Sequence, residues 1–305
     1  MFKQAKPPIE TTQMKKVGKT IQTLDLRRWV EQAPEAQRHF RQAVHVVLLA
    51  IGTSNNLRSQ MVMKGGMLMA IRYNSLRFTK DADFSTRNLY QAGDEDRLVS
   101  QLCEAIDAVN ASTDYDTMCL LQTAKLRPKG IVKTFPTLTI SVGYAARSQP
   151  RALQRLLNKQ SPNVVELDCS FNEAILDAEL LRLADGQGLQ VYSLVNLMAE
   201  KYRSLLQQPI RNRNRRQDVY DLWLLISQLE NFSASEKTHL TACIEASCAT
   251  KNIAATRDSL SDPVVRQMSC IGFKDLSAEV GEDLPTFDVA YEALERFFED
   301  LPWSS

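Results

Sequence analysis

The chain has 305 residues, the length of one large domain or two unequal ones, and its 44% hydrophobic and 24% charged residues are typical of a globular protein. The formal net charge is only +1, so any affinity for nucleic acid must come from a local basic surface. Six cysteines without a CxxC pair argue against a zinc ribbon or a disulfide scaffold. The sequence shows neither the apolar core of a signal peptide nor the roughly 20 apolar residues of a membrane span, which predicts a cytoplasmic protein without membrane contact.

The first half of the chain alternates predicted helices and strands. Residues 1–22 are polar and proline-containing, which predicts a flexible N-terminal arm. Apolar residues at helical spacing predict a helix over 35–51, and residues 94–109 have the same spacing after an acidic start. Short strands are expected at 61–63, directly before a glycine pair, and at 81–84, where polar and apolar residues alternate.

The second half changes from strands to helices. Residues 115–126 and 134–145 are rich in β-branched and aromatic residues around a turn, which predicts a hairpin, and 164–171 predicts a further strand. From about residue 190 onward the pattern is helical. We therefore expect an α+β fold with a mixed sheet, in which a catalytic domain over 23–187 is followed by a helical C-terminal domain over 188–305.

Two carboxylates lie two residues apart in the predicted strand 81–84. Side chains at i and i+2 of a strand share a face, so Asp81 and Asp83 lie side by side and would repel each other. A divalent cation resolves such repulsion, and Mg²⁺ is commonly held by one or two carboxylates with phosphate oxygens and water. Asp168, in the predicted strand 164–171, is the candidate for a third carboxylate in a two-metal site.

The glycine pair before the first helix of this segment suits an anion. Without Cβ atoms, Gly65 and Gly66 let the backbone approach a phosphate, and the N-terminus of the following helix offers unpaired N–H groups. The sequence therefore predicts a phosphate site opposite the carboxylates.

Four motifs in this order resemble a known superfamily. The glycine pair, the intervening helix and Arg77-Phe-Thr79-Lys-Asp81-Ala-Asp83 are similar to the DNA polymerase β-like nucleotidyltransferases. More narrowly, Ala199-Glu200-Lys201-Tyr-Arg203 and Arg215-Arg216-Gln-Asp218-Val-Tyr-Asp221 resemble the late motifs of the AbiEii/AbiGii toxin family. The resemblance covers roughly residues 55 to 230.

The resemblance implies a function and roles for the motif residues. It implies a polymerase β-like fold, Mg²⁺-dependent transfer of a nucleoside monophosphate from an NTP to a nucleic acid such as tRNA, and a phage-defence or toxin-antitoxin system with a cognate antitoxin. Lys201 would act on the nucleotide phosphates together with Arg77 and Thr79 beside the glycines. Asp218 and Asp221, one helical turn apart, would orient Lys201 from behind.

One residue departs from the motif and keeps two alternatives open. Many relatives have Ser or Thr directly after the second glycine, where a hydroxyl helps to hold a triphosphate, whereas this chain has Met67. The same carboxylates could instead serve a glycosylase or hydrolase acting on phage DNA. A nucleic-acid-binding module without catalysis is the third hypothesis.

A basic run precedes the last motif. Arg211, Arg213, Arg215 and Arg216 form either a solvated loop before a helix or a patch that contacts the phosphates of a nucleic acid. Both interpretations stay open on the sequence.

Overall fold

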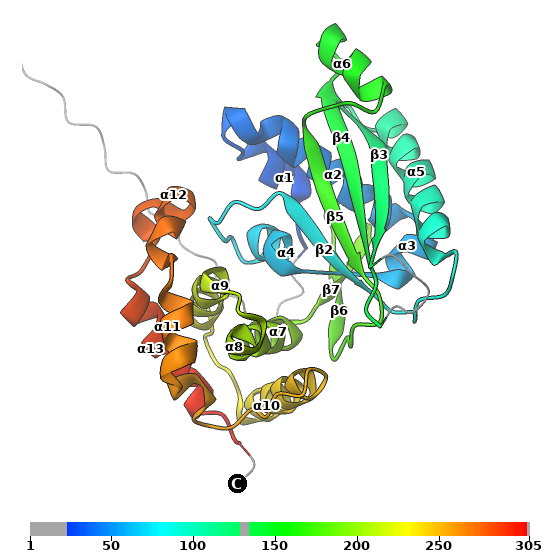
Figure 1. Cartoon of the computed structure of the whole chain (residues 1–305). Helices are drawn as coiled ribbons and strands as arrows, with labels where there is room; N and C mark the ends of the chain where they lie inside the picture. The colour runs from blue at the N-terminus through cyan, green and yellow to red at the C-terminus, as the bar shows by residue number, and fades with distance from the viewer. Residues whose placement is uncertain (1–22, 129–133, 304–305) are drawn as a thin grey trace, which may run out of the picture.

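The computed structural model describes residues 23–128 and 134–303. The arm expected at 1–22 lies outside the described residues. Among these residues, helices and strands form a mixed sheet followed by a group of helices, so the α+β expectation is confirmed (Figure 1).

The centre of the fold is a seven-stranded sheet with the order β3-β4-β5-β2-β1-β7-β6. Its strands are β1 (Met61–Lys64), β2 (Asp81–Thr86), β3 (Thr117–Arg127), β4 (Thr137–Ala146), β5 (Val164–Ser170), β6 (Ala178–Arg182) and β7 (Gly188–Tyr192). β2 pairs parallel with β5 and β1 pairs parallel with β7, while the other neighbours are antiparallel. The hairpin expected around residue 128 is β3-β4.

The middle strands have one apolar and one polar face. In β5 the buried residues alternate with half-buried ones, and β4 begins with the same alternation. Two helices pack on the apolar side of the sheet (Figure 1). Helix α2 (Arg38–Thr53) packs against β3 to β5, and α5 (Asp94–Ser112) packs against β3. The polar side chains of β2, β4 and β5 therefore share the opposite face.

Helices before and between the strands include those expected over 35–51 and 94–109, which are α2 and α5. The helices of this part of the chain are α1 (Leu26–Glu31), α2 (Arg38–Thr53), α3 (Asn55–Gln60), α4 (Gly65–Arg72), α5 (Asp94–Ser112) and α6 (Pro150–Leu157). Three acidic residues in the first turn of α5 complement the positive end of its dipole, as expected from the acidic start of this segment.

The C-terminal helices lie to the lower left of the sheet in Figure 1. They are α7 (Leu194–Leu206), α8 (Gln208–Arg211), α9 (Arg216–Ser227), α10 (Ala234–Ala249), α11 (Pro263–Cys270), α12 (Ser277–Val280) and α13 (Phe287–Glu299). Ser193 caps the N-terminus of α7, and Ser233 with Glu236 forms a capping box at α10. Helix α7 packs against α10 and α9, and α13 packs against α9.

The sheet extends past the expected domain boundary. β7 begins at Gly188, directly after the expected boundary, yet it pairs with both β6 and β1. The first residues of the segment expected to be helical therefore form a strand, and helices begin only at Leu194. A division of the chain into two domains stays a prediction. Within the described residues, no helix is long and apolar enough to cross a membrane.

Candidate nucleotidyl-transfer site

The three predicted carboxylates come together on the polar face of the sheet. In the parallel pair β2 and β5, Asp83 lies directly opposite Asp168, and Asp81 lies two residues before Asp83 on the same face. The hydroxyl of Thr139 on β4 donates a hydrogen bond of 2.7 Å to Oδ1 of Asp168. This bond fixes one oxygen of Asp168 and leaves its other oxygen for a different partner.

The surroundings of Asp81 and Asp83 favour their protonated forms. Burial, together with Glu200, Asp168 and Asp81, raises the pKa of Asp83 to about 6, although Lys64 opposes this. Partial burial and the neighbouring Asp168 also raise the pKa of Asp81. Burial and neighbouring carboxylates thus disfavour the ionised forms of Asp81 and Asp83, and a divalent cation bound beside them would relieve this cost.

Position 65 requires a glycine for two reasons, its backbone conformation and the close approach of Asp83. Its φ of +71° lies in the left-handed region, and an added Cβ would lie 2.1 Å from Oδ2 of Asp83. An added Cβ on Gly66 would lie 2.8 Å from a terminal guanidinium nitrogen of Arg77 and 3.3 Å from the hydroxyl of Thr79. The structure thus brings both glycines, Asp83, Arg77 and Thr79 into contact distance at the start of α4.

Position 67, directly after the glycine pair, lies in the core. Met67 is 1% exposed and belongs to the hydrophobic core. The hydroxyl that lies next to the glycine pair is that of Thr79. The effect of Met67 on nucleotide transfer stays a hypothesis.

Lys201 lies in a buried cluster with both predicted aspartates. Its Nζ is 2.6 Å from Oδ2 of Asp221 and 3.1 Å from Oδ1 of Asp218. Arg77 donates to both carboxylate oxygens of Asp221, at 3.4 and 3.2 Å. Although burial opposes it, the two aspartates raise the pKa of Lys201, and Lys201 with Arg77 lowers the pKa of fully buried Asp221. Helix α9 therefore holds a lysine of α7 and an arginine of the segment before β2 in fixed positions.

The four arginines of the basic run are not equivalent. Arg211 and Arg213 are exposed, whereas Arg215 and Arg216 are half-buried. Arg216 donates to Asp275 at 3.2 Å. A role of this run in nucleic-acid binding stays a prediction, and Arg216 is the member already engaged within the chain.

Sequence reasoning did not find a second buried lysine beside the site. Lys64, at the end of β1, forms ion pairs with Glu173 and, at 3.3 Å, with Glu200. Against the effect of burial, Glu200, Tyr192 and Glu173 raise its pKa, so this lysine is charged. Its only sequence signal was a charged residue at the end of an apolar strand, because its partners lie more than 100 positions away.

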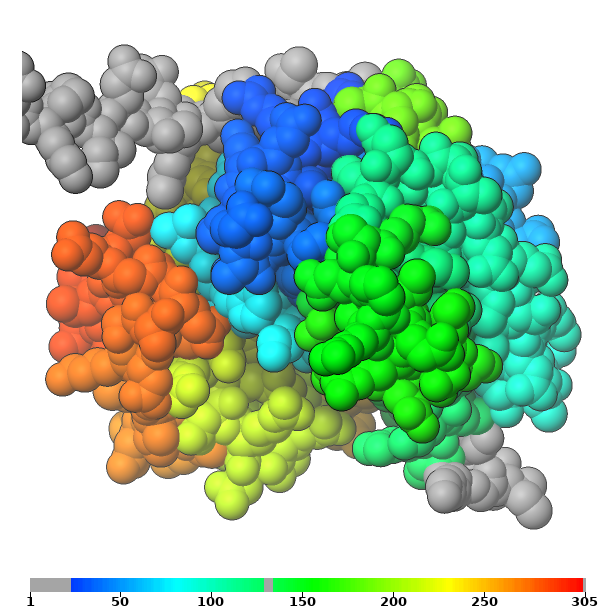
Figure 2. Space-filling model, turned by 90° about the horizontal axis from the view of Figure 1, so that it is seen from above, coloured from blue at the N-terminus to red at the C-terminus, as the bar shows by residue number. Residues whose placement is uncertain are grey.

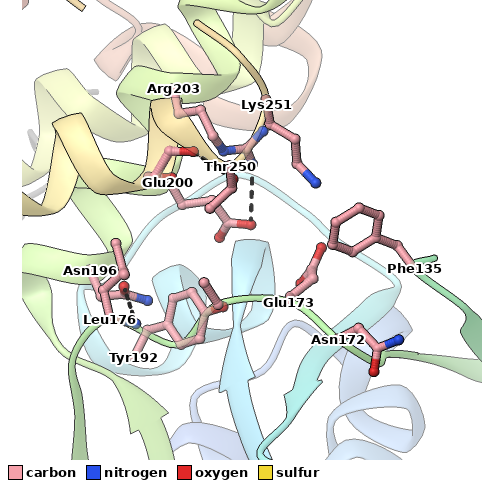
Figure 3. Close-up of a pocket in the computed structure, with 12 residues that line it drawn as sticks. Phe135, Asn172, Glu173, Leu176, Tyr192, Asn196, Glu200, Arg203, Thr250 and Lys251 are labelled. Atoms are coloured by element: carbon pink, nitrogen blue, oxygen red, sulfur yellow. Dashed lines mark hydrogen bonds and ion pairs between the residues drawn. The ribbon is translucent and has the colours of Figure 1, made fainter. Parts of the chain in front are cut away.

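A cavity of about 230 Å³ adjoins this second lysine (Figure 3). Glu173 and Glu200, the partners of Lys64, line it, and Tyr192 forms a 2.9 Å hydrogen bond with Ser85 of β2 at its edge. Viewed from above, the cyan segment that leads into β2 lies between the orange C-terminal helices and the green strands (Figure 2). The sheet and the helices thus both contribute to the surroundings of the carboxylates.

The carboxylates fit a Mg²⁺ site that the protein and a bound nucleotide complete together, and not a site that the protein forms alone. Among the described residues, no group of three or more His, Cys, Asp or Glu side chains is arranged to hold a metal ion. Mg²⁺ is usually bound by one or two protein carboxylates and completed by phosphate oxygens and water. The paired Asp83 and Asp168, with Asp81 beside them, match that requirement once a nucleotide supplies its phosphates.

Comparisons with known proteins agree with this geometry. A search of curated proteins finds no match. The crystal structure of a candidate nucleotidyltransferase from H. pylori has the same fold, with a TM-score of 0.53, 14% sequence identity and coverage of 88% of this chain and 95% of that chain. The family model described as "Nucleotidyl transferase AbiEii toxin, Type IV TA system" matches residues 48–295, which contain all the site residues described above. The chain therefore belongs to the AbiEii family of nucleotidyltransferase toxins.

Proposed function

We propose that this nucleotidyltransferase transfers a nucleoside monophosphate from an NTP to a nucleic-acid hydroxyl, with tRNA as the acceptor, in a Mg²⁺-dependent reaction. The observation that carries the proposal is the register of β2 and β5, which sets Asp83 opposite Asp168 beside the start of α4. Family membership supports a toxin with a cognate antitoxin, and we extend this to defence against phage.

The reaction has a simple balance. The acceptor oxygen attacks the α-phosphorus of the NTP, the bond to the bridging oxygen between the α- and β-phosphates breaks, and pyrophosphate leaves with that oxygen. The acceptor hydroxyl loses its proton to solvent or to a nearby carboxylate. Bound Mg²⁺ supplies the charge stabilisation that such a phosphoryl transfer needs.

The side chains have separate tasks in this proposal. Asp81, Asp83 and Asp168 hold the cations, and Thr139 orients Asp168 through its hydrogen bond. Gly65 and Gly66 let the backbone N–H groups at the start of α4 approach the phosphates. Because these glycines lie next to Asp83, the phosphates and the cations would share one location.

The buried cluster behind the glycines has no net charge and acts on the phosphates through the fixed positions of its charged groups. Lys201 and Arg77 carry two positive charges, and Asp221 and Asp218 hold these two cations in place. A triphosphate would approach a charge pattern that is already organised, so little free energy is lost in arranging it. The family model that matches residues 48–295 describes a nucleotidyl transferase, which favours nucleotide transfer over the glycosylase or hydrolase alternative.

A transfer assay tests the proposal. Purified protein is incubated with each NTP labelled in the α-phosphate, Mg²⁺ and total tRNA, and label in the RNA is measured after electrophoresis. We expect labelled tRNA with the wild-type protein, a loss of at least a hundredfold with Asp83→Asn, and no change with Asp107→Asn on the exposed side of α5. Labelling by Asp83→Asn at the wild-type rate would contradict the proposal.

A further inference from the structure

The cavity beside Lys64 continues the carboxylate row along one strand. Asp81, Asp83 and Ser85 occupy alternate positions of β2 and so share a face. The Ser85 hydroxyl lies 2.8 Å from Oε2 of Glu173 and 2.9 Å from the hydroxyl of Tyr192, and both of these residues line the cavity. The cavity therefore lies next to Asp83 along β2, within reach of a ligand bound at Asp83.

The lining of the cavity has the chemistry of a nucleobase site. Tyr192 and Phe135 contribute aromatic rings, and Asn172 and Asn196 contribute amides (Figure 3). Phe135 is 43% exposed at the rim, where Nζ of Lys251 lies 3.7 Å from the centre of its ring. Stacking on aromatic rings and hydrogen bonding by amides are the two means by which proteins bind single bases.

One of these amides has a buried donor without a partner. Asn196 is 3% exposed, and its Oδ1 accepts a 3.2 Å hydrogen bond from the backbone N–H of Leu176. Its Nδ2 is buried and has no hydrogen-bond partner among the described residues. In Figure 3 this nitrogen points away from Leu176, toward Tyr192. A buried donor left unpaired costs free energy, so a ligand that accepts from it gains by binding here.

Helix α7 connects the cavity to the proposed phosphate site. Asn196 and Glu200 line the cavity, while the adjacent Lys201 reaches the cluster with Asp218 and Asp221. On the sheet side, Lys64 pairs with two cavity residues and directly precedes Gly65. On α7 and at the end of β1, residues of the phosphate site are thus adjacent in sequence to residues that line the cavity or pair with its lining.

We propose that the cavity holds the base of the donor NTP, and that Nδ2 of Asn196 donates a hydrogen bond to a carbonyl oxygen of that base. This inference rests on the proposed function. Cytosine, uracil and guanine have such an oxygen, whereas adenine has none. The enzyme therefore selects CTP, UTP or GTP against ATP through Asn196, while Phe135 stacks on the base without distinguishing the four.

Measuring the equilibrium binding of the four ribonucleoside triphosphates in the presence of Mg²⁺ tests the assignment of the cavity to the donor base. This measurement does not require nucleotide transfer. Asn196→Asp keeps an oxygen for the Leu176 N–H and replaces the donor by a second oxygen. Asn110→Asp is the matched control, because Asn110 is also buried but both of its amide groups bind the backbone of Cys119. Phe135→Ala is a rim substitution that should leave the fold intact even if the Asn196 variant is unstable.

We expect at least one carbonyl-bearing NTP to bind the wild-type protein on the order of tenfold more tightly than ATP. Asn196→Asp should remove that ratio, Asn110→Asp should keep it, and Phe135→Ala should weaken all four nucleotides several-fold. Unchanged ratios in Asn196→Asp, equal affinities in the wild type, or unchanged binding by Phe135→Ala would each overturn the inference. If the cavity variants used different RNA 3′ ends from the wild type while their NTP affinity ratios stayed the same, the cavity would bind the acceptor and not the donor base.

Failure of the proposed function gives a different result. If base selection by Asn196 is observed but no acceptor is ever labelled, the assignment of the cavity stands and the transfer reaction does not.

Discussion

Without a bound cation, the surroundings of Asp83 disfavour the ionised carboxylate that the proposed metal site needs. Burial and nearby carboxylates raise its pKa to about 6, whereas an unfolded aspartate has a pKa of about 3.9. The folded protein therefore binds this proton more tightly than the unfolded chain. Ionisation of Asp83 consequently destabilises the fold as the pH rises from about 4, and the penalty is complete above about 6.

Replacing Asp83 should therefore stabilise the protein while removing its activity. At pH 7.5 without divalent cations, Asp83→Asn should raise the free energy of unfolding by about 2–3 kcal/mol, and this gain should vanish near pH 4. Urea denaturation at several pH values measures it.

Adding Mg²⁺ provides the control for this prediction. The cation favours the ionised carboxylate, so Mg²⁺ should raise the melting temperature of the wild-type protein and leave that of Asp83→Asn unchanged. Equal responses of the two proteins to Mg²⁺ would show that Asp83 does not bind it.

At the same scale, the sequence allowed the carboxylates to be predicted but not their neighbours. Asp81 and Asp83 share a face because of strand periodicity, and Asp168 was found through its own strand. Lys64 and Glu173 were missed because nothing local links a lysine in an apolar strand to a glutamate 109 positions later. Their contact depends on the parallel pairing of strands that are distant in sequence.

Among the elements, the start of α4 depends most closely on one residue. Gly65→Ala would face two costs, a left-handed backbone and a Cβ 2.1 Å from the Asp83 carboxylate. We expect loss of transfer activity and destabilisation above the roughly 1–2 kcal/mol of left-handed strain alone.

Gly186 provides the matched control. Its φ is +87°, but an added Cβ there would meet nothing within 4 Å, so Gly186→Ala should show only the backbone cost and keep activity. Chemical denaturation and the transfer assay measure both variants. Equal losses of activity would mean that the contact between Gly65 and Asp83 is unimportant.

The packing of α7 against α9 gives a second prediction at this scale. Asp221 is fully buried between Lys201 and Arg77, so Asp221→Asn leaves two buried cations poorly neutralised. We expect destabilisation of about 3–5 kcal/mol. Asp218 forms an ion pair with Lys201 and is partly exposed, so Asp218→Asn should cost about 1–2 kcal/mol. The midpoints of urea unfolding compare the stability of the two variants. A smaller loss of stability in Asp221→Asn than in Asp218→Asn would disprove the central role of the Asp221 carboxylate.

Element prediction succeeded for the long patterns and for the short strands β1 and β2, but it missed β6 and β7. The β3-β4 hairpin and helices α2 and α5 follow from runs of ten or more residues. β6 and β7 contain five residues each, and β7 is held by β1, more than 120 positions earlier. The expected boundary after residue 187 therefore falls between two paired strands.

For the whole molecule, the fold is better preserved than the sequence. The H. pylori protein shares the architecture over 88% of this chain at only 14% identity. The motifs that allowed the family to be predicted lie on both the sheet and the C-terminal helices, since β2 carries Asp83 and α9 carries Asp221. The site therefore requires both parts of the chain.

The most direct test of the account follows the two ends of the triphosphate separately. The protein is incubated with acceptor RNA, Mg²⁺ and NTP labelled in either the α- or the γ-phosphate, and radioactivity in RNA and in pyrophosphate is measured. We predict that the α-label enters the RNA and the γ-label appears only in pyrophosphate, and that Asp83→Asn shows neither. Entry of the γ-label into RNA, or base release without transfer of either label, would contradict the account.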